Sequence, residues 1–390
     1  MSAADRLKIL YAINRMDVGG SQTHLVQVLR LLDRQRFDPV LCVLSGEGSL
    51  LDDARATGAR ILDGRVRTGF KSLKVLPAAM GLARRLRSEA PDIVHNYLLR
   101  ANAVGSVAAR LARVPIVLAS KRGCHEMKGW ELRGAQVGNA LSDCVTTNAE
   151  AVREFVHLDE SCPVDKMVVI PSGIDTDRFS PLAESGFKER LGLVADRPVV
   201  GIVTRMRVRK GVEEFLAAMI KVRARHPGTQ AVIVGEVELD RDLSALVETG
   251  GMTSDLHLLG RRSDMPEVLA AFDLFVLSSH DEGMSNAILE AMAMERAVVA
   301  TDVGGTGEVV REGVTGYLVE PRVVDPLADA IDKVLSDETA MHEMGRRGRA
   351  IVVESFSSRS MVKQMEALYV TLVRQKGLVA NAPTRMGSTV

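Results

Sequence analysis

Short apolar runs alternate with longer amphipathic segments along this chain, and this alternation constrains the fold more than any other feature. In the first half, residues 8–14, 39–44, 92–97, 115–120 and 143–148 are apolar runs of strand length. The intervening segments 21–34 and 76–89 carry apolar residues at three- and four-residue spacing, which predicts helices. Strands and helices in this order predict a parallel sheet covered on both faces, and the aromatic content of only 4% agrees with aliphatic buried strands.

The pattern then starts again near residue 197. Residues 197–211 repeat the order of residues 8–20, with an apolar strand, Arg-Met, a polar loop and glycine. Further strands are predicted at 230–235, 255–260, 273–279 and 296–301. The fold class expected is therefore α/β, with two Rossmann-like domains facing each other across a cleft.

The expected boundaries follow from this repeat. An N-terminal domain spans 1–175 and a C-terminal domain 176–355, joined by the turn-rich segment 170–181. A closing helix at 356–376 is expected to pack back toward the N-terminal domain, and 377–390 is expected to be a mobile tail.

Composition excludes several classes of protein. The net charge of the 390 residues is zero, which gives no reason to expect nucleic acid as a partner. The four cysteines are scattered, with no Cys-x-x-Cys and no neighbouring His cluster, which is typical of reduced thiols in a cytoplasmic protein. No uncharged apolar run approaches the roughly 20 residues that a membrane-spanning helix needs.

In each half, a glycine-containing loop follows the first strand. Gly19 and Gly20 precede a predicted helix, where backbone amides attract a phosphate. Arg205 and Lys210 follow the first strand of the second half, and two fixed cations suit a diphosphate. A tight strand-to-helix turn and a solvated basic turn are the alternative interpretations of these two loops.

The stretch HDEGMSNAILEAMAMERAVVATDVGGTGE, residues 280–308, presents a third such loop. Backbone amides at Gly283, Met284 and Ser285 lead into a predicted helix, so they favour an anion. Glu282 and Glu290 are carboxylates, which accept hydrogen bonds from sugar hydroxyls and repel phosphate. The stretch thus predicts a ligand with an anionic part and a hydroxyl-rich part. A paired-acid hydrolase and simple helix-dipole stabilisation remain as alternatives.

Several motifs in the same order resemble the retaining glycosyltransferases of family four, which have the GT-B fold. They are MDVGGSQTHL, PDIVHNYLLRAN, VIPSGIDTDRFSP, VTRMRVRKG, the pair Glu282 and Glu290 separated by seven residues, VVATDVGG and GVTGYLVEP. These motifs extend over residues 8–325. Together they are specific, although each glycine pair alone is not.

The resemblance implies a role for each matching residue. Arg205 and Lys210 would hold the diphosphate of a nucleotide sugar, Glu290 the ribose and Glu282 the transferred sugar. The backbone at Gly19, Gly20 and 283–285 would complete the donor contacts. The implied reaction is transfer with retention of configuration, without metal or cofactor. The Asp-x-Asp at 175–177 lies in the connector and is interpreted as a turn.

Three positions depart from the family pattern. The family often carries His-x-His where this chain has His95-Asn96-Tyr97, so we keep His95 as a catalytic candidate beside the alternative of a structural histidine. Glu295-Arg296-Ala297 replaces a usual Gly-x-Pro, with a modest effect on the backbone expected. Ser172 replaces a common Asn.

The expected partners are a nucleotide sugar and a glycan or lipid-linked acceptor, in bacterial surface polysaccharide or glycolipid synthesis. The basic segments 65–75 and 120–135 are candidates for acceptor binding and for peripheral contact with the cytoplasmic face of the inner membrane. They are equally consistent with ordinary solvated loops. A nucleotide-sugar-binding protein without transfer activity and a sugar-nucleotide epimerase stay open. A two-domain dehydrogenase is disfavoured, because no Gly-x-Gly-x-x-Gly occurs.

Overall fold

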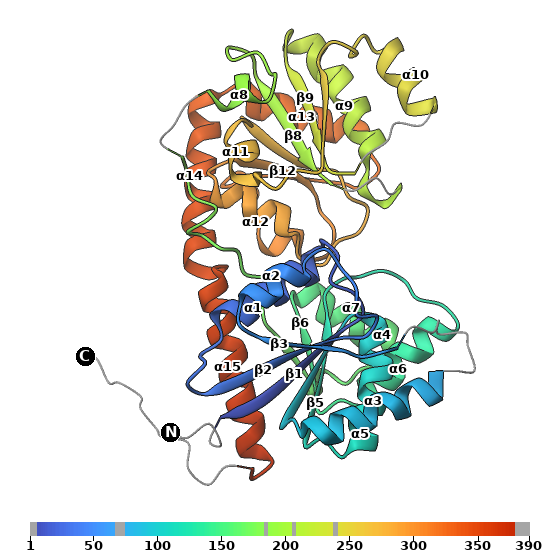
Figure 1. Ribbon diagram of the computed structural model, residues 1–390. Coiled ribbons are helices and arrows are strands. Elements are labelled where there is room, and N and C mark those ends of the chain that lie inside the picture. Colours follow the sequence, from blue (N-terminus) through green and yellow to red (C-terminus); the bar gives the residue numbers. More distant parts are fainter. Residues whose placement is uncertain (1–5, 67–74, 183–185, 205–207, 237–240, 379–390) are drawn as a thin grey trace.

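The computed structural model describes residues 6–66, 75–182, 186–204, 208–236 and 241–378, and its described strands form two parallel sheets (Figure 1). The N-terminal sheet has the order β3-β2-β1-β4-β5-β6-β7 and the C-terminal sheet the order β10-β9-β8-β11-β12-β13. The strands of the first are β1 (Leu7–Ile13), β2 (Phe37–Val43), β3 (Arg60–Asp63), β4 (Ile93–Tyr97), β5 (Ile116–Lys121), β6 (Cys144–Thr147) and β7 (Met167–Val169). Those of the second are β8 (Val199–Val203), β9 (Gln230–Val234), β10 (Leu256–Gly260), β11 (Leu274–Leu277), β12 (Ala297–Thr301) and β13 (Gly316–Val319).

Helices cover both faces of each sheet. Those of the N-terminal part are α1 (Gly20–Leu31), α2 (Leu51–Ala56), α3 (Val75–Glu89), α4 (Leu98–Arg100), η2 (Ala101–Gly105), α5 (Ser106–Ala112), α6 (Trp130–Leu141), α7 (Glu150–Glu160) and η3 (Val164–Lys166). Those that follow are α8 (Phe187–Arg190), η4 (Val208–Lys210), α9 (Val212–Arg225), α10 (Arg241–Thr249), α11 (Met265–Ala270), α12 (Asn286–Ala293), η5 (Gly304–Glu308), α13 (Val324–Leu335), α14 (Glu338–Ser355) and α15 (Ser358–Gln375). No helix in the described part of the chain is long and apolar enough to cross a membrane.

The structure confirms the strands that the sequence pattern predicts, with ends that differ by no more than about two residues. The central strands β1 and β4 are almost wholly buried, as expected for aliphatic strands between two helix layers. The pattern misses β3, β7 and β13. These strands have only three or four residues and contain partly exposed positions, so they present no long apolar run.

In each sheet the strand order reverses at one point, between β1 and β4 and between β8 and β11. Loops that follow neighbouring strands separate at such a point and leave a crevice at the carboxyl edge of the sheet. The loops after β8 and β11 contain Lys210 and Glu282. The topology therefore places these two residues at the reversal point of the C-terminal sheet.

The chain passes between the two domains twice, near Ile174 and near Phe356, and these two segments lie side by side. The amide of Ile174 donates to the carbonyl of Phe356 at 2.8 Å, and the amide of Ser358 donates to the carbonyl of Ile174 at 2.8 Å. After the second crossing, α15 runs along the lower lobe in Figure 1. Its residues Met361 and Tyr369 belong to the hydrophobic core that contains β1. The last helix therefore packs in the N-terminal core.

Glu295, at the position of the family's usual glycine, has a left-handed backbone with φ of 59°. A side chain in this conformation costs about 1 kcal/mol or more. Arg296 stabilises the turn, because its guanidinium donates to the carbonyl of Phe272 at 2.7 Å. The chain thus keeps the backbone that glycine favours although the residue has changed.

Candidate active site

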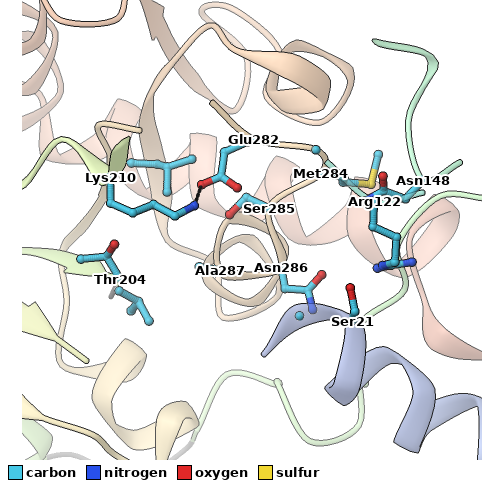
Figure 2. Close-up of a pocket in the computed structure, with 14 residues that line it drawn as sticks. Ser21, Arg122, Asn148, Thr204, Lys210, Glu282, Met284, Ser285, Asn286 and Ala287 are labelled. Carbon is cyan, nitrogen blue, oxygen red and sulfur yellow. Dashed lines mark hydrogen bonds and ion pairs between the residues drawn. The ribbon is translucent and has the colours of Figure 1, made fainter. Parts of the chain in front are cut away.

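A pocket of about 290 Å³ lies between the two domains, and side chains from both line it. From the C-terminal domain come Lys210 and residues 282–287, which include the start of α12; from the N-terminal domain come Gly20, Ser21, Arg122 and Asn148 (Figure 2). A second pocket of about 660 Å³ shares Gly20, Thr204, Asn286 and other residues with the first, so the two form one cleft. The predicted cleft between two Rossmann-like domains is therefore present.

Lys210 and Glu282 form an ion pair in this cleft. The Lys210 ammonium contacts Glu282 Oε1, which also accepts from Ser279 Oγ at 2.8 Å. The two side chains are 26% and 14% exposed, so the pair is shielded but open to a ligand. The sequence places the two residues 72 positions apart, and only the adjacency of β8 and β11 brings them together.

The loop between Glu282 and α12 presents backbone to the pocket. Gly283, Met284 and Ser285 all line it, and α12 begins at Asn286 as predicted. Ser285 makes no side-chain cap, so the first amides of α12 have no side-chain partner at this helix end. Free amides and the helix dipole make this end of the pocket favourable for a phosphate.

The backbone of Gly304 and Gly305 packs against the backbone of this loop. Gly304 has φ of 52°, and a Cβ there would lie 2.0 Å from the Glu282 carbonyl oxygen. The amide of Gly305 donates to the carbonyl of Gly283 at 2.6 Å. Because both contacts need a bare backbone, the glycine pair fixes the position of Glu282 and of the amides beside it.

Glu290 lies one turn inside α12 and lines the larger pocket. Its carboxylate has no hydrogen-bond partner among the described residues, and burial raises its pKa to about 7, with Arg178 opposing the shift. A hydrogen bond from a ligand hydroxyl would stabilise the ionised carboxylate in this buried environment. Glu282 and Glu290 thus lie in different parts of the cleft, which does not favour a paired-acid hydrolase.

Gly19 and Gly20 line the same cleft, and Gly20 lies opposite Asn286 at the start of α12. Gly19 lines the larger pocket and has an extended backbone with φ of 179°, which any residue adopts. A Cβ on Gly20 would lie at an ordinary 3.6 Å from the Asn286 amide group. Neither glycine is therefore required by strain, and their missing side chains leave room in the cleft.

Comparison with known proteins places the chain in a family. Residues 18–178 match the model described as Glycosyltransferase Family 4, and residues 197–337 match the one described as Glycosyl transferases group 1. A GDP-mannose-dependent alpha-(1-6)-phosphatidylinositol monomannoside mannosyltransferase of Mycobacterium tuberculosis is 30% identical over 85% of this chain and 89% of that protein. The chain belongs to the family 4 glycosyltransferases.

Two further relatives span the full length. An Escherichia coli protein named UDP-Gal:alpha-D-GlcNAc-diphosphoundecaprenol alpha-1,3-galactosyltransferase is 28% identical over 96% of this chain and 100% of that protein. The structure of Anabaena HepE with UDP superimposes with a TM-score of 0.82, covering 94% of this chain and all of that chain at 22% identity. The fold is therefore GT-B.

Two predicted site residues remain to be located, Arg205 and His95. Arg205 lies outside the described residues. His95 is fully buried in β4, with Nδ1 at 2.8 Å from Tyr369 Oη and Nε2 at 3.4 Å from Thr146 Oγ1. Burial lowers its pKa to about 3, so the ring is neutral. Tyr97 is also fully buried. This geometry matches the structural alternative for His95, which packs between the sheet and α15, and does not place it at the pocket.

Arg122 and Asn148 also line the pocket, and the sequence motifs predict neither as a site residue. Arg122 follows β5 and lies within the basic segment 120–135. The basic character of that segment was the sequence feature that pointed to acceptor binding in this region. Its Nη2 donates to Ser172 Oγ at 2.9 Å, and Asn148 Nδ2 donates to the same oxygen at 3.3 Å. Ser172, one of the departures from the family pattern, thus holds both side chains in place.

Glu308 contacts the N-terminal domain beside this site. Its carboxylate accepts from the amides of Glu150 at 3.0 Å and Ala151 at 2.9 Å, the first residues of α7. Ala149, the residue before that helix, makes no side-chain cap. The cap of α7 is therefore supplied by the other domain, and it connects η5 to the lobe that carries Arg122 and Asn148.

Glu308→Ala should lower the equilibrium constant for closure of the cleft about fivefold, since a lost cap costs about 1 kcal/mol. Small-angle scattering should show a larger radius of gyration, and kcat should fall by a similar factor. Glu312→Ala is the matched control, because Glu312 accepts from the amide of Leu318 at 2.7 Å within one domain. Equal effects of the two substitutions would contradict the interdomain role.

Proposed function

We propose that this chain is a retaining, metal-independent glycosyltransferase that moves a sugar from a nucleotide sugar to a glycan or lipid-linked acceptor. We place it in the synthesis of a bacterial surface polysaccharide or glycolipid. The observation that carries the proposal is the pairing of Lys210 with Glu282 beside the uncapped start of α12, in a cleft between two domains. Cationic, amide and carboxylate groups there match the diphosphate and hydroxyls of such a donor.

The residues divide the chemistry between them. Lys210 and the amides of 283–285 would hold the diphosphate and stabilise the negative charge that develops as it leaves. Glu282 would accept from the hydroxyls of the transferred sugar, and Glu290 from those of the ribose. Arg205 keeps the diphosphate role that the family resemblance implies. Closure of the two domains would exclude water and limit hydrolysis.

The acceptor side belongs to the N-terminal domain in this proposal. The Escherichia coli relative is named for a diphosphoundecaprenol-linked acceptor, which supports a lipid-linked acceptor here. Leu76 and Met80 on α3 and Trp130 and Val137 on α6 are large apolar residues that remain exposed. Such residues suit peripheral contact with the cytoplasmic face of a membrane. Sedimentation with phosphatidylglycerol vesicles, against phosphatidylcholine vesicles, tests this contact.

A panel of UDP- and GDP-sugars tests the transfer itself. Nucleotide release should require both a matching donor and a glycan acceptor, should continue in EDTA, and the product should keep the donor's anomeric configuration by NMR. Binding without acceptor-dependent release across a broad panel would indicate a nucleotide-sugar-binding protein. Release together with a rearranged free sugar would indicate an epimerase.

The proposed ribose contact makes nucleotide affinity depend on pH. The Glu290 pKa is about 7 in the free protein because of burial. Hydroxyls that donate to the carboxylate favour its ionised form, so binding should strengthen as pH rises from about 6 to about 8 and then level off. Calorimetric titration of UDP or GDP measures this. Glu290→Gln, which does not titrate, should show only the ligand's own pH dependence; identical profiles for both proteins would exclude the ribose contact.

A further inference from the structure

Arg122 is a shielded cation without an acidic partner. It follows β5, its side chain is partly buried at the pocket wall, and among the described side chains it donates to the neutral Ser172 hydroxyl. No ion pair involves it in the part of the chain that the structure describes. Burial lowers its pKa to about 10, and Tyr97 is the group that opposes this shift.

The described groups whose pKa shift includes an effect of Arg122 are two histidines and a tyrosine, and none is a carboxylate. The guanidinium influences His24, His95 and Tyr97, all of which are buried and uncharged in their ordinary state. A cation removed from water with no counter-charge costs several kcal/mol. The chain keeps it at the edge of a binding cleft, which indicates that an anionic ligand group completes the site.

Two neighbours extend the polar surface around the guanidinium. Asn148 is 1% exposed, and its Oδ1 has no hydrogen-bond partner although the side chain lines the pocket. Ser21 lies in the first turn of α1, a 12-residue helix whose start has no side-chain cap and no acidic residue. Figure 2 shows the Arg122 guanidinium and the Ser21 hydroxyl extending toward the same part of the pocket. Amides and a guanidinium together suit phosphate oxygens, and Asn148 suits a hydroxyl or amide donor.

We propose that Arg122, with Ser21 and Asn148, binds a phosphate group carried by the acceptor, next to the hydroxyl that receives the sugar. This inference rests on the proposed transferase function. The donor diphosphate already has Lys210 and the start of α12, and Lys210 lies on the other side of the pocket from Arg122 in Figure 2. Arg122 also comes from the N-terminal domain. The acceptor class is therefore a sugar linked to a phosphate or diphosphate.

Calorimetry with two probes tests the site without turnover. UDP or GDP, whichever binds, is titrated first, and inorganic pyrophosphate is then titrated into the nucleotide-saturated protein. Arg122→Gln should weaken pyrophosphate binding at least tenfold and leave the nucleotide Kd within twofold, while Arg122→Lys should retain part of the affinity. If wild type binds no pyrophosphate, the proposed acceptor phosphate site is wrong. If Arg122→Gln weakens nucleotide binding instead, the proposal is also wrong, and Arg122 belongs to the site of the donor diphosphate.

The matched control is Arg100→Gln. Arg100 is also half-buried, and its hydrogen bonds among the described residues go to neutral groups, the Asn14 side chain and the Val66 carbonyl. It lines neither part of the cleft. It should leave both titrations unchanged. A loss of pyrophosphate binding in this variant equal to that of Arg122→Gln would overturn the proposal.

Turnover separates this proposal from the transferase function. With an alkyl-diphosphate sugar as acceptor, Arg122→Gln should raise the acceptor KM at least tenfold and leave the nucleotide-sugar KM unchanged. With the neutral alkyl glycoside of the same sugar, the variant should equal wild type. If wild type releases no nucleotide with any acceptor, the transferase proposal is wrong, and the pyrophosphate titration still decides the anion site.

Discussion

Lys210→Ala should reduce kcat by about 100- to 1000-fold, the loss typical when one electrostatic donor to a developing charge is removed. In the free protein, the substitution leaves Glu282 with Ser279 as its hydrogen-bond partner among the described side chains. With donor bound, the uncompensated carboxylate would also lie near the anionic diphosphate and repel it. Both effects act on the leaving group, so kcat should fall more than the acceptor KM changes. Steady-state kinetics with the best donor from the panel measures this.

Arg209→Ala is the matched control for this substitution. Arg209 is the preceding residue and pairs with Asp281, the residue before Glu282, at 2.7 Å, with side chains 45% and 30% exposed. An exposed pair contributes about 1 kcal/mol or less. The control should stay within about threefold of wild type. A Lys210→Ala enzyme as active as this control would remove Lys210 from the phosphate site.

Lys121→Ala should destabilise the N-terminal domain by about 3–5 kcal/mol, because it leaves a buried carboxylate without its cation. Lys121 ends β5 and pairs with Glu160 at the end of α7, and the two side chains are 7% and 3% exposed. The other contact of the carboxylate is Asn139 Nδ2 at 2.8 Å. Urea denaturation, monitored by hydrogen exchange of the N-terminal core, should show this loss in the free energy of unfolding.

Two variants distinguish charge burial from a general effect of mutation. Lys121→Met combined with Glu160→Leu should recover most of the stability, since an apolar pair of similar volume has no desolvation cost. Lys221→Ala removes an exposed pair with Asp325 and should cost about 1 kcal/mol or less. A Lys121→Ala protein within about 1 kcal/mol of wild type would show that water reaches Glu160 and that the pair is not structurally important.

The sequence predicts those site residues that lie next to a recognisable strand end. Lys210, Glu282 and the amides at 283–285 lie in the loops that follow apolar strands, and parallel strands direct their following loops to one edge. The same reasoning fails for His95. A histidine near the end of a strand can face the cleft or the core, and contact with Tyr369 from the distant α15 is what buries it.

Arg122 shows the opposite failure. Within the segment 120–135 it is one basic residue among several, and local sequence does not distinguish a solvated cation from a shielded one. Its environment comes from Ser172 in the connector and from buried tyrosine and histidine side chains of α1 and β4. Contacts between residues this far apart in the chain leave no periodic signal.

The amino-acid sequence by itself determined the two α/β halves, the family resemblance and the loops that carry the donor site. These properties follow from local periodicity and from motifs whose residues are close together in the chain. Only the tertiary structure decided that Lys210 pairs with Glu282, that Glu308 caps a helix of the other domain, and that Arg122 forms no ion pair within the described ranges. Each of these depends on which distant groups share a low-dielectric space, and burial and charge pairing are properties of the folded chain.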